Sequence, residues 1–291
     1  MANDEFILGR CKSGFEKFLP KKVILIGAGA IHESWKPLQD TFLHAREISK
    51  INKDIYESDS CNNQMAGYLA QLVFHFHSVA MGKLKLADDT TLAPARKGAI
   101  DAEIEKILAN YHSFVSAVGD SFSRQVLILR DEIEYVKQNM DDETGVVVLN
   151  WDETIWNLRD IFPNIIQVHG RTSFPETMIF PAEICLEKIH FSKILGGTHF
   201  QNDNLLALES AHRFSYEWFS SAREIISWGV GYNLYESELN IILESAFYRE
   251  RGDGALDRVI NINPDRSTRL SISRLMNFPV EKIQHYFDHK T

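Results

Sequence analysis

Short apolar runs recur along the chain, and each ends on glycine or asparagine. They are KVILIG (22–27), VVVLN (146–150), IIQVHG (165–170), EIISWG (224–229) and RVININ (258–263), with TMIFP (177–181) as a weaker sixth candidate. Continuous apolar runs of this length are typical of strands that are buried on both faces of a parallel sheet. Longer amphipathic stretches separate them, so the sequence predicts an α/β fold in which helices flank a parallel sheet.

The amphipathic stretches predict where the helices lie. From about residue 55 to about 140, apolar residues recur at helical spacing, which predicts a helical insertion, and another helix is expected over 205–222. The C-terminal segment, about 266–291, predicts two amphipathic helices interrupted near Pro279. The apolar positions that carry the insertion are Met65, Leu69, Leu72, Val73, Phe76, Ile104, Ile107, Leu108, Tyr111 and Phe114.

Composition excludes several classes of protein. The chain has 291 residues, 44% of them hydrophobic and 24% charged, which is ordinary for a globular protein with a full core. A net charge of -9 argues against direct binding of nucleic acid, which needs a concentrated cationic surface. No apolar run approaches the roughly 20 residues of a membrane helix, so we expect no membrane contact, no signal peptide and a cytoplasmic location. Cys11, Cys61 and Cys185 stand far apart, so neither a disulfide framework nor a metal site is expected.

The ends of the predicted strands carry the candidate chemistry. Ligands of open α/β sheets bind beyond the carboxyl ends of the strands, and Asn150 and His169 end two of the apolar runs. If these strands are neighbours, both side chains emerge at one edge and face one pocket, with Asp152 two residues further on. The first run ends in the loop Gly27–Ala30, where glycine permits close approach of backbone N–H groups to a phosphate. The third glycine of GxGxxG is missing, so the dehydrogenase fingerprint is not met.

Each of these features also has a structural interpretation. Asn150 and Asp152 are common capping residues and can begin a helix over DETIWNLRD (152–160). The His-Gly pair and the GAG loop can be ordinary turns. The later stretches WGVGY (228–232) and INPD (262–265) can be a packed strand end and a turn.

Taken in order, the GAG loop, the Asn-x-Asp element, the His-Gly element, the late glycine-rich loop and the final Asn-bearing strand resemble the sirtuin-like proteins, in which these elements surround NAD. The resemblance spans about residues 20–265 and implies a single Rossmann-like domain over 1–291, with a sheet of about six strands. Two features depart from the protein deacylases of that family. Their GAG loop continues as Gly-Ile-Pro-Asp-Phe-Arg, whereas this chain reads GAGAIHESWKPLQD, and their four zinc-binding cysteines are absent here.

Without the zinc module, the chain is similar to the bacterial sirtuin-like NAD hydrolases of antiphage defence, which deplete NAD in an infected cell and so abort the infection. This resemblance implies a NAD glycohydrolase that releases nicotinamide and ADP-ribose, with NAD as the substrate and no metal or other cofactor. Asn150 would position water or the ribose hydroxyls, and His169 would bind a ribose hydroxyl and act as a base. Asp152 would either accept a hydrogen bond from the nicotinamide amide or stabilise the cationic ring before it departs. The pyrophosphate would contact Gly27, Ala28, Gly29 and Ala30, and the adenosine end would contact Gly229 and Asn263.

The resemblance also implies regulation, since a constantly active NAD hydrolase would kill its host. We therefore expect a homo-oligomer and a separately encoded sensor or activator, such as a nucleotide-handling protein or an ATPase. Two other functions stay open. One is a module that senses NAD or ADP-ribose without cleaving it, and the other is a sirtuin-type protein deacylase or ADP-ribosyl transferase.

Overall fold

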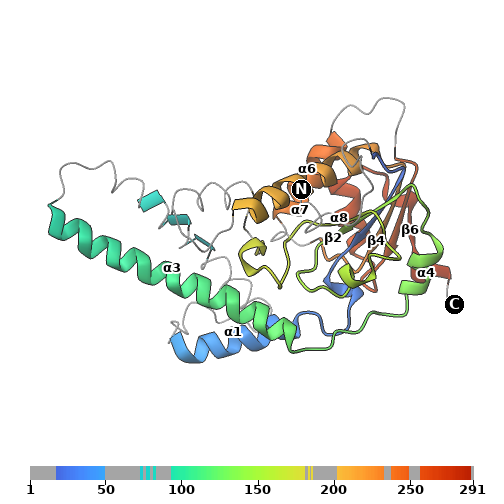
Figure 1. Ribbon diagram of the computed structural model, residues 1–291. Helices are drawn as coiled ribbons and strands as arrows, with labels where there is room; N and C mark the ends of the chain where they lie inside the picture. Colours follow the sequence, from blue (N-terminus) through green and yellow to red (C-terminus); the bar gives the residue numbers. More distant parts are fainter. Residues whose placement is uncertain are drawn as a thin grey trace.

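The computed structural model describes residues 18–49, 93–180, 202–232, 237–248 and 256–289, together with positions 73, 74, 77, 78, 81, 82, 183 and 185. Its centre is a six-stranded sheet in which every pair of neighbouring strands is parallel (Figure 1). The order β3-β2-β1-β4-β5-β6 is that of a doubly wound Rossmann-like fold, so the predicted fold class is confirmed. The strands are β1 (Lys22–Ile26), β2 (Thr144–Val148), β3 (Ile165–Gln167), β4 (Glu224–Trp228), β5 (Arg258–Ile262) and β6 (Ile283–His285).

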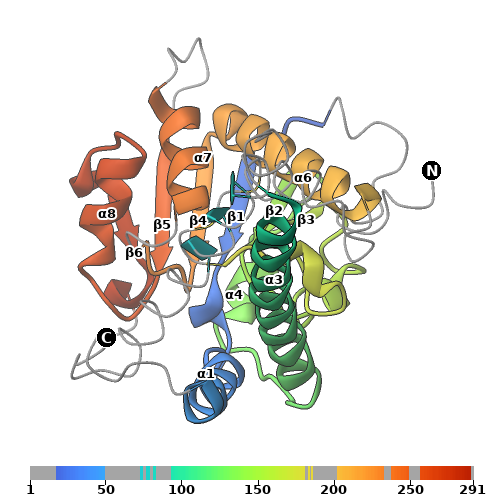
Figure 2. The same ribbon diagram turned by 90° about the vertical axis from the view of Figure 1, so that its left-hand side faces the viewer.

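Helices surround this sheet, and short 3-10 turns connect several of its strands (Figure 2). The α-helices are α1 (Lys36–Ser49), α3 (Pro94–Ser123), α4 (Ile133–Gln138), α6 (Asn202–Ser221), α7 (Ser237–Tyr248) and α8 (Thr268–Leu275). The 3-10 turns are η3 (Ala28–Ala30), η5 (Trp156–Leu158), η6 (Pro175–Thr177), η7 (Val280–Lys282) and η8 (Tyr286–His289). The helix predicted over 205–222 is therefore confirmed as α6.

The two faces of the sheet are covered by different elements. Successive side chains of a strand point to opposite faces, so Val23 and Leu25 of β1 pack with α6, α7 and α8, where Trp218 is fully buried. Ile24 and Ile26 pack on the other face with α4 and η5. Both faces are apolar, which explains why the strands read as continuous apolar runs rather than as alternating ones.

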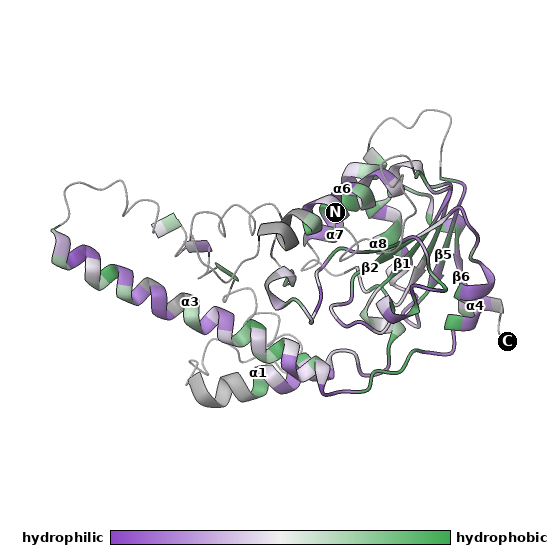
Figure 3. Cartoon of the chain, in the orientation of Figure 1, coloured by the Kyte–Doolittle hydropathy of each residue, from purple (hydrophilic) through white to green (hydrophobic). Residues whose placement is uncertain are grey.

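Helix α3 is the largest described part of the predicted insertion. Its C-terminal half buries Tyr111, Phe114, Val118 and Phe122 in the core beside the sheet, whereas its N-terminal half extends away from the sheet (Figure 1). On the side of α3 seen in Figure 3, both hydrophilic and hydrophobic residues occur along that extending half. Residue Val73 is helical and buried, while the predicted positions Met65, Leu69, Leu72 and Phe76 lie outside the described residues.

One predicted strand is wrong, and one strand was missed. TMIFP (177–181) does not join the sheet: Thr177 ends η6, and the chain then runs past the end of β3, where the Ile179 N–H donates to the His169 carbonyl oxygen at 2.9 Å. The second of the two predicted C-terminal helices is instead β6 between two 3-10 turns. Its sequence Ile-Gln-His alternates buried, exposed and buried, and it pairs with the edge of β5.

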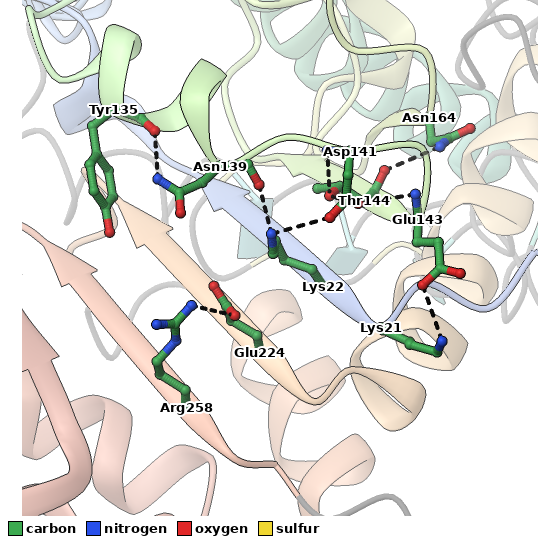
Figure 4. A network of polar contacts seen from close by, with 10 residues as sticks. All are labelled: Lys21, Lys22, Tyr135, Asn139, Asp141, Glu143, Thr144, Asn164, Glu224 and Arg258. Atoms are coloured by element: carbon green, nitrogen blue, oxygen red, sulfur yellow. Dashed lines mark hydrogen bonds and ion pairs between the residues drawn. The ribbon is translucent and has the colours of Figure 1, made fainter.

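Ion pairs connect the strands at their amino ends (Figure 4). Lys22 donates to the Asn139 carbonyl oxygen at 2.8 Å and lies 3.4 Å from the Asp141 carboxylate. Arg258 and Glu224 pair at 2.6 Å across β5 and β4. These pairs lie at the first residues of the strands. Because the neighbouring strands are in register, their carboxyl ends lie side by side at the opposite edge of the sheet.

Candidate functional site

A cavity of about 250 Å³ lies at the carboxyl ends of β1, β2, β3 and β4. From β1 the chain adds β2 and β3 on one side of the sheet, and it then adds β4, β5 and β6 on the other side. Ligands of such sheets bind at the switch point, which here lies between β1 and β4. The sequence-predicted residues Asn150, Asp152 and His169 all line it, as do Gly27, Ala28, Gly29, Gly229 and Asn263. The rest of the lining is Ser34, Trp35, Phe122, Leu149, Trp151, Ile179, Phe180, Glu183, Val230, Gly231 and Glu238. Ala30 is fully buried and does not line the cavity.

The floor of the cavity is made by two glycine loops in backbone contact. The Gly27 N–H donates to the Trp228 carbonyl oxygen at 2.9 Å, and the Gly29 N–H donates to the Gly229 carbonyl oxygen at 2.8 Å. Gly229 has φ of +67°, and a Cβ there would lie 2.1 Å from the Ala30 nitrogen. Loop packing therefore accounts for these glycines. The N–H groups of Gly27 and Gly29 already donate to carbonyl oxygens of the protein, so they do not point to a phosphate. The predicted contact of this loop with the pyrophosphate stays a prediction.

Asn150 is the least satisfied polar residue of the cavity. Its side chain is buried, and neither amide atom has a hydrogen-bond partner among the described residues. The backbone around it is fixed, because the Gln167 side-chain amide on β3 donates to the carbonyl oxygens of both Asn150 and Asp152. The capping interpretation of Asn150 is wrong, since its side chain caps nothing and DETIWNLRD forms turns and η5 rather than an α-helix. A rigid backbone thus carries an amide that lacks a protein partner.

Asp152 has a different environment. One carboxylate oxygen accepts the Thr154 N–H at 2.9 Å, so this side chain does stabilise the local turn. Burial raises the pKa of Asp152, while hydrogen bonds from Thr154 and the proximity of the polar Asn150 side chain oppose that rise. Its carboxylate combines a structural contact with a position on the cavity wall.

His169 lines the cavity from the segment that follows β3. Burial, and to a smaller extent the positive charge of His212, lower the pKa of His169 to about 4, although Glu238 opposes the shift. The ring also hydrogen-bonds the backbone of Leu149. At neutral pH the imidazole is therefore uncharged, with one nitrogen donating to the Leu149 carbonyl and a lone pair on the other nitrogen.

Asn263 uses both ends of its amide to hold the loops. The side-chain NH₂ donates to the Val230 carbonyl oxygen at 2.9 Å, and the side-chain oxygen accepts the Asp265 N–H at 2.9 Å. The residue thus ties the end of β5 to the loop after β4. Its predicted contact with adenosine stays a prediction.

Acidic and aromatic residues of the cavity were missed from the sequence. Glu183 accepts hydrogen bonds from the Tyr111 hydroxyl at 3.1 Å and from the Phe180 N–H at 3.0 Å. Trp151 packs edge-on against Phe180 at 5.1 Å between ring centroids. Trp35 and Trp151 were open to prediction, because one follows the GAG loop and the other lies between Asn150 and Asp152. Glu183 and Glu238 belong to no motif.

The charge of the cavity is one-sided. Its ionisable lining residues among the described part of the chain are Asp152, His169, Glu183 and Glu238, and no lysine or arginine is among them. Carboxylates in a partly apolar hollow favour a ligand that is cationic, or that becomes cationic as it reacts. No group of three or more potential metal ligands occurs among the described residues.

Comparisons with protein-family models, with curated proteins and with solved structures found no match for this chain. The resemblance to the sirtuin-like family therefore stays a prediction. Within the described part of the chain, no helix is both long enough and apolar enough to span a bilayer.

Proposed function

We propose that the protein is a NAD glycohydrolase, which cleaves the bond between nicotinamide and ribose to give nicotinamide and ADP-ribose. The observation that carries this proposal is the buried Asn150 amide, which has no hydrogen-bond partner among the described residues and lines the same cavity as the uncharged His169. A buried polar group without a partner costs roughly 1–3 kcal/mol, so a protein that keeps one gains most when a ligand fills its hydrogen bonds.

The chemistry fits these side chains. As the glycosidic bond breaks, positive charge develops on the ribose, and nearby carboxylates such as Asp152 and Glu183 stabilise that charge. Asn150 can donate and accept, so it orients the attacking water or the ribose hydroxyls without adding charge. His169 offers a lone pair at neutral pH, which suits a base that accepts a proton from a ribose hydroxyl or from the water. The water oxygen bonds to the ribose carbon, and nicotinamide leaves with the electron pair of the broken bond.

The biological setting of the proposal rests on the resemblance alone. The protein would act as an antiphage effector that depletes NAD and aborts infection. The activity would be held off until self-assembly or a separately encoded sensor or activator completes the site during infection. Size-exclusion chromatography, alone and with neighbouring gene products, tests this part: full activity in an isolated monomer would contradict it.

The test of the activity is a NAD cleavage assay with etheno-NAD, in which fluorescence reports cleavage and chromatography identifies the products. Wild type is compared with Asn150→Ala and His169→Ala, with candidate activators present. The matched control is Asn157→Ala, because Asn157 is an exposed asparagine in the same connection that does not line the cavity. We expect activity in the wild type and the control and its loss in the two site variants. Equal activity in all four proteins would contradict the site, and binding of NAD without cleavage would favour the sensing module.

A further inference from the structure

A buried ion pair lies directly behind His169. His212 on α6 and Glu238 in the first turn of α7 approach within 2.6 Å, between Nδ1 and Oε1, and both side chains are about nine-tenths buried. The other carboxylate oxygen of Glu238 accepts the Cys185 N–H at 3.0 Å. The pair therefore joins α6, α7 and the backbone of Cys185, and Glu238 itself lines the cavity.

The contacts of His212 fix its charge. Its second ring nitrogen, Nε2, is in hydrogen-bond contact with the Val168 carbonyl oxygen, which can only accept. On the opposite side of the ring, the hydrogen bond and positive charge of His212 lower the pKa of Glu238, although burial opposes this by raising it. Glu238 is thus an anionic acceptor. A ring that faces two acceptors donates to both of them only when it carries a proton on each nitrogen, as an imidazolium does.

The bonded carbonyl belongs to Val168, the residue immediately before His169. We propose that His212 is a positioning residue: held as a cation by Glu238, it anchors the backbone that carries His169 and keeps the His169 imidazole uncharged. This inference deepens the proposed function, since the role of an uncharged His169 in hydrolysis rests on that function. The sequence carries no signal for this role, because His212 lies within an ordinary amphipathic helix.

The charged groups around His169 come from several elements. His212 on α6 lowers the pKa of His169, Glu238 on α7 raises it, and burial has the largest effect. Asp152 and Glu183 line the same cavity. Replacing His212 by a neutral residue removes the cation that disfavours protonation of His169. It leaves the Glu238 anion, which favours that protonation. A nearby charge of this kind moves a pKa by about 1–3 units.

The test is a pH titration of the free protein by NMR with nitrogen-15 in the histidine rings. The variant His212→Gln keeps a side-chain donor but loses the charge. The matched control is Ser215→Ala on the same helix, which removes only the bond from the Ser215 hydroxyl to the His212 carbonyl oxygen. We expect His212 to be doubly protonated at pH 7 in the wild type, and the titration of His169 to move up by at least about one pH unit in His212→Gln and not in Ser215→Ala. A neutral His212, or an unmoved His169 titration, would overturn the inference.

A second variant covers the case in which His212→Gln does not fold. In Glu238→Gln the anionic acceptor is gone, so we expect the ring nitrogen of His212 that faces residue 238 to lose the proton signal seen at pH 7 in the wild type; an unchanged signal at that nitrogen would contradict the pairing. These spectra need no substrate. If the wild type fails to cleave NAD but the titrations move as expected, the proposed function fails and the charge relation stands. If NAD is cleaved, the acid limb of the kcat/KM profile should move with the His169 titration of the free protein. A shift from about 4 to about 6 would lower kcat/KM at pH 5 by about tenfold.

Discussion

Polar side chains have different environments at the two edges of the sheet. At the amino edge, cations and anions from neighbouring strands pair with one another and remain partly exposed, as Arg258 with Glu224 and Arg223 with Asp257 (Figure 4 shows the first of these). At the carboxyl edge, Asn150 is buried with both amide atoms unpaired, and His169 is buried without a charge. The same sheet therefore has one edge whose polar groups bind each other and one whose polar groups face a cavity.

The difference between the two edges concerns what their polar side chains contribute to stability and to function. Exposed ion pairs contribute about 0–1 kcal/mol each, so the amino edge aligns the strands at small energetic gain. An unpaired buried amide costs roughly 1–3 kcal/mol, and the carboxyl edge keeps one beside a cavity. The changes below should therefore affect activity at one edge and leave both activity and stability nearly unaltered at the other.

The largest effect should follow Asn150→Ala. We expect nicotinamide release to fall about 100- to 1,000-fold, because a preorganised polar contact to the reacting centre is lost. The free energy of unfolding should stay level or rise by up to about 1 kcal/mol, since an unpaired buried amide disappears. Cleavage assays and urea denaturation measure the two quantities. A variant that keeps its activity and loses stability would show that the amide is structural.

Gly229→Ala should be the most destabilising single change at the carboxyl edge. The new Cβ would lie 2.1 Å from the Ala30 nitrogen, and the residue would keep a left-handed φ of +67°. Strain and overlap together should reduce the free energy of unfolding by about 4 kcal/mol. Thermal or urea denaturation would show this. Near-normal stability would mean that the two glycine loops are not in tight contact.

Acid should destabilise the protein through His169. The ordinary pKa of histidine is 6.5, whereas burial, together with the His212 charge, lowers the pKa of His169 to about 4 in the folded state. Between these values the unfolded chain binds a proton that the folded chain does not. The contribution of His169 to the free energy of unfolding is therefore fully present above pH 6.5. It falls by up to roughly 3 kcal/mol as the pH drops to 4.

The control for this effect is His169→Gln, which has no titrating ring. Urea denaturation at pH 7, 5.5 and 4 should show a smaller loss of stability in the variant than in the wild type. Parallel curves for the two proteins would mean that His169 is not buried in its uncharged form.

The smallest effect should follow Arg223→Gln at the amino edge. Arg223 and Asp257 pair at 2.8 Å, but more than half of each side chain is exposed. We expect the free energy of unfolding to change by less than about 0.5 kcal/mol and NAD cleavage to stay unchanged. A large loss of stability or of NAD cleavage in this variant would contradict the proposed difference between the two edges.

The sequence predicted the parts of the site that lie at strand ends. Asn150, His169 and Gly229 meet at one cavity because parallel strands bring their carboxyl ends to one edge, which is a consequence of the fold class. His212 and Glu238 were not predictable in this way, since their pairing depends on how α6 packs beside α7.

The errors of the sequence analysis have similar causes. TMIFP (177–181) has the composition of a strand, yet it follows a 3-10 turn beyond the end of β3 and does not enter the sheet. The three residues of β6 are too few to show a period by themselves, and they form a strand because β5 offers a free edge. The bonds that occupy the Gly27 and Gly29 N–H groups depend on the distant Trp228–Gly229 segment.

The most direct test of the central claim is the response of the Asn150 side-chain amide to ligand. NMR of the nitrogen-15-labelled protein with ADP-ribose, the proposed product, avoids turnover and observes the amide itself. Asn139 at the amino edge, whose side chain donates to the Tyr135 carbonyl oxygen at 2.8 Å, serves as the internal reference. The Asn150 amide signals should shift on titration while those of Asn139 stay in place. Asn150 signals that do not move at saturating ADP-ribose would contradict the claim that this amide is kept unpaired for a ligand.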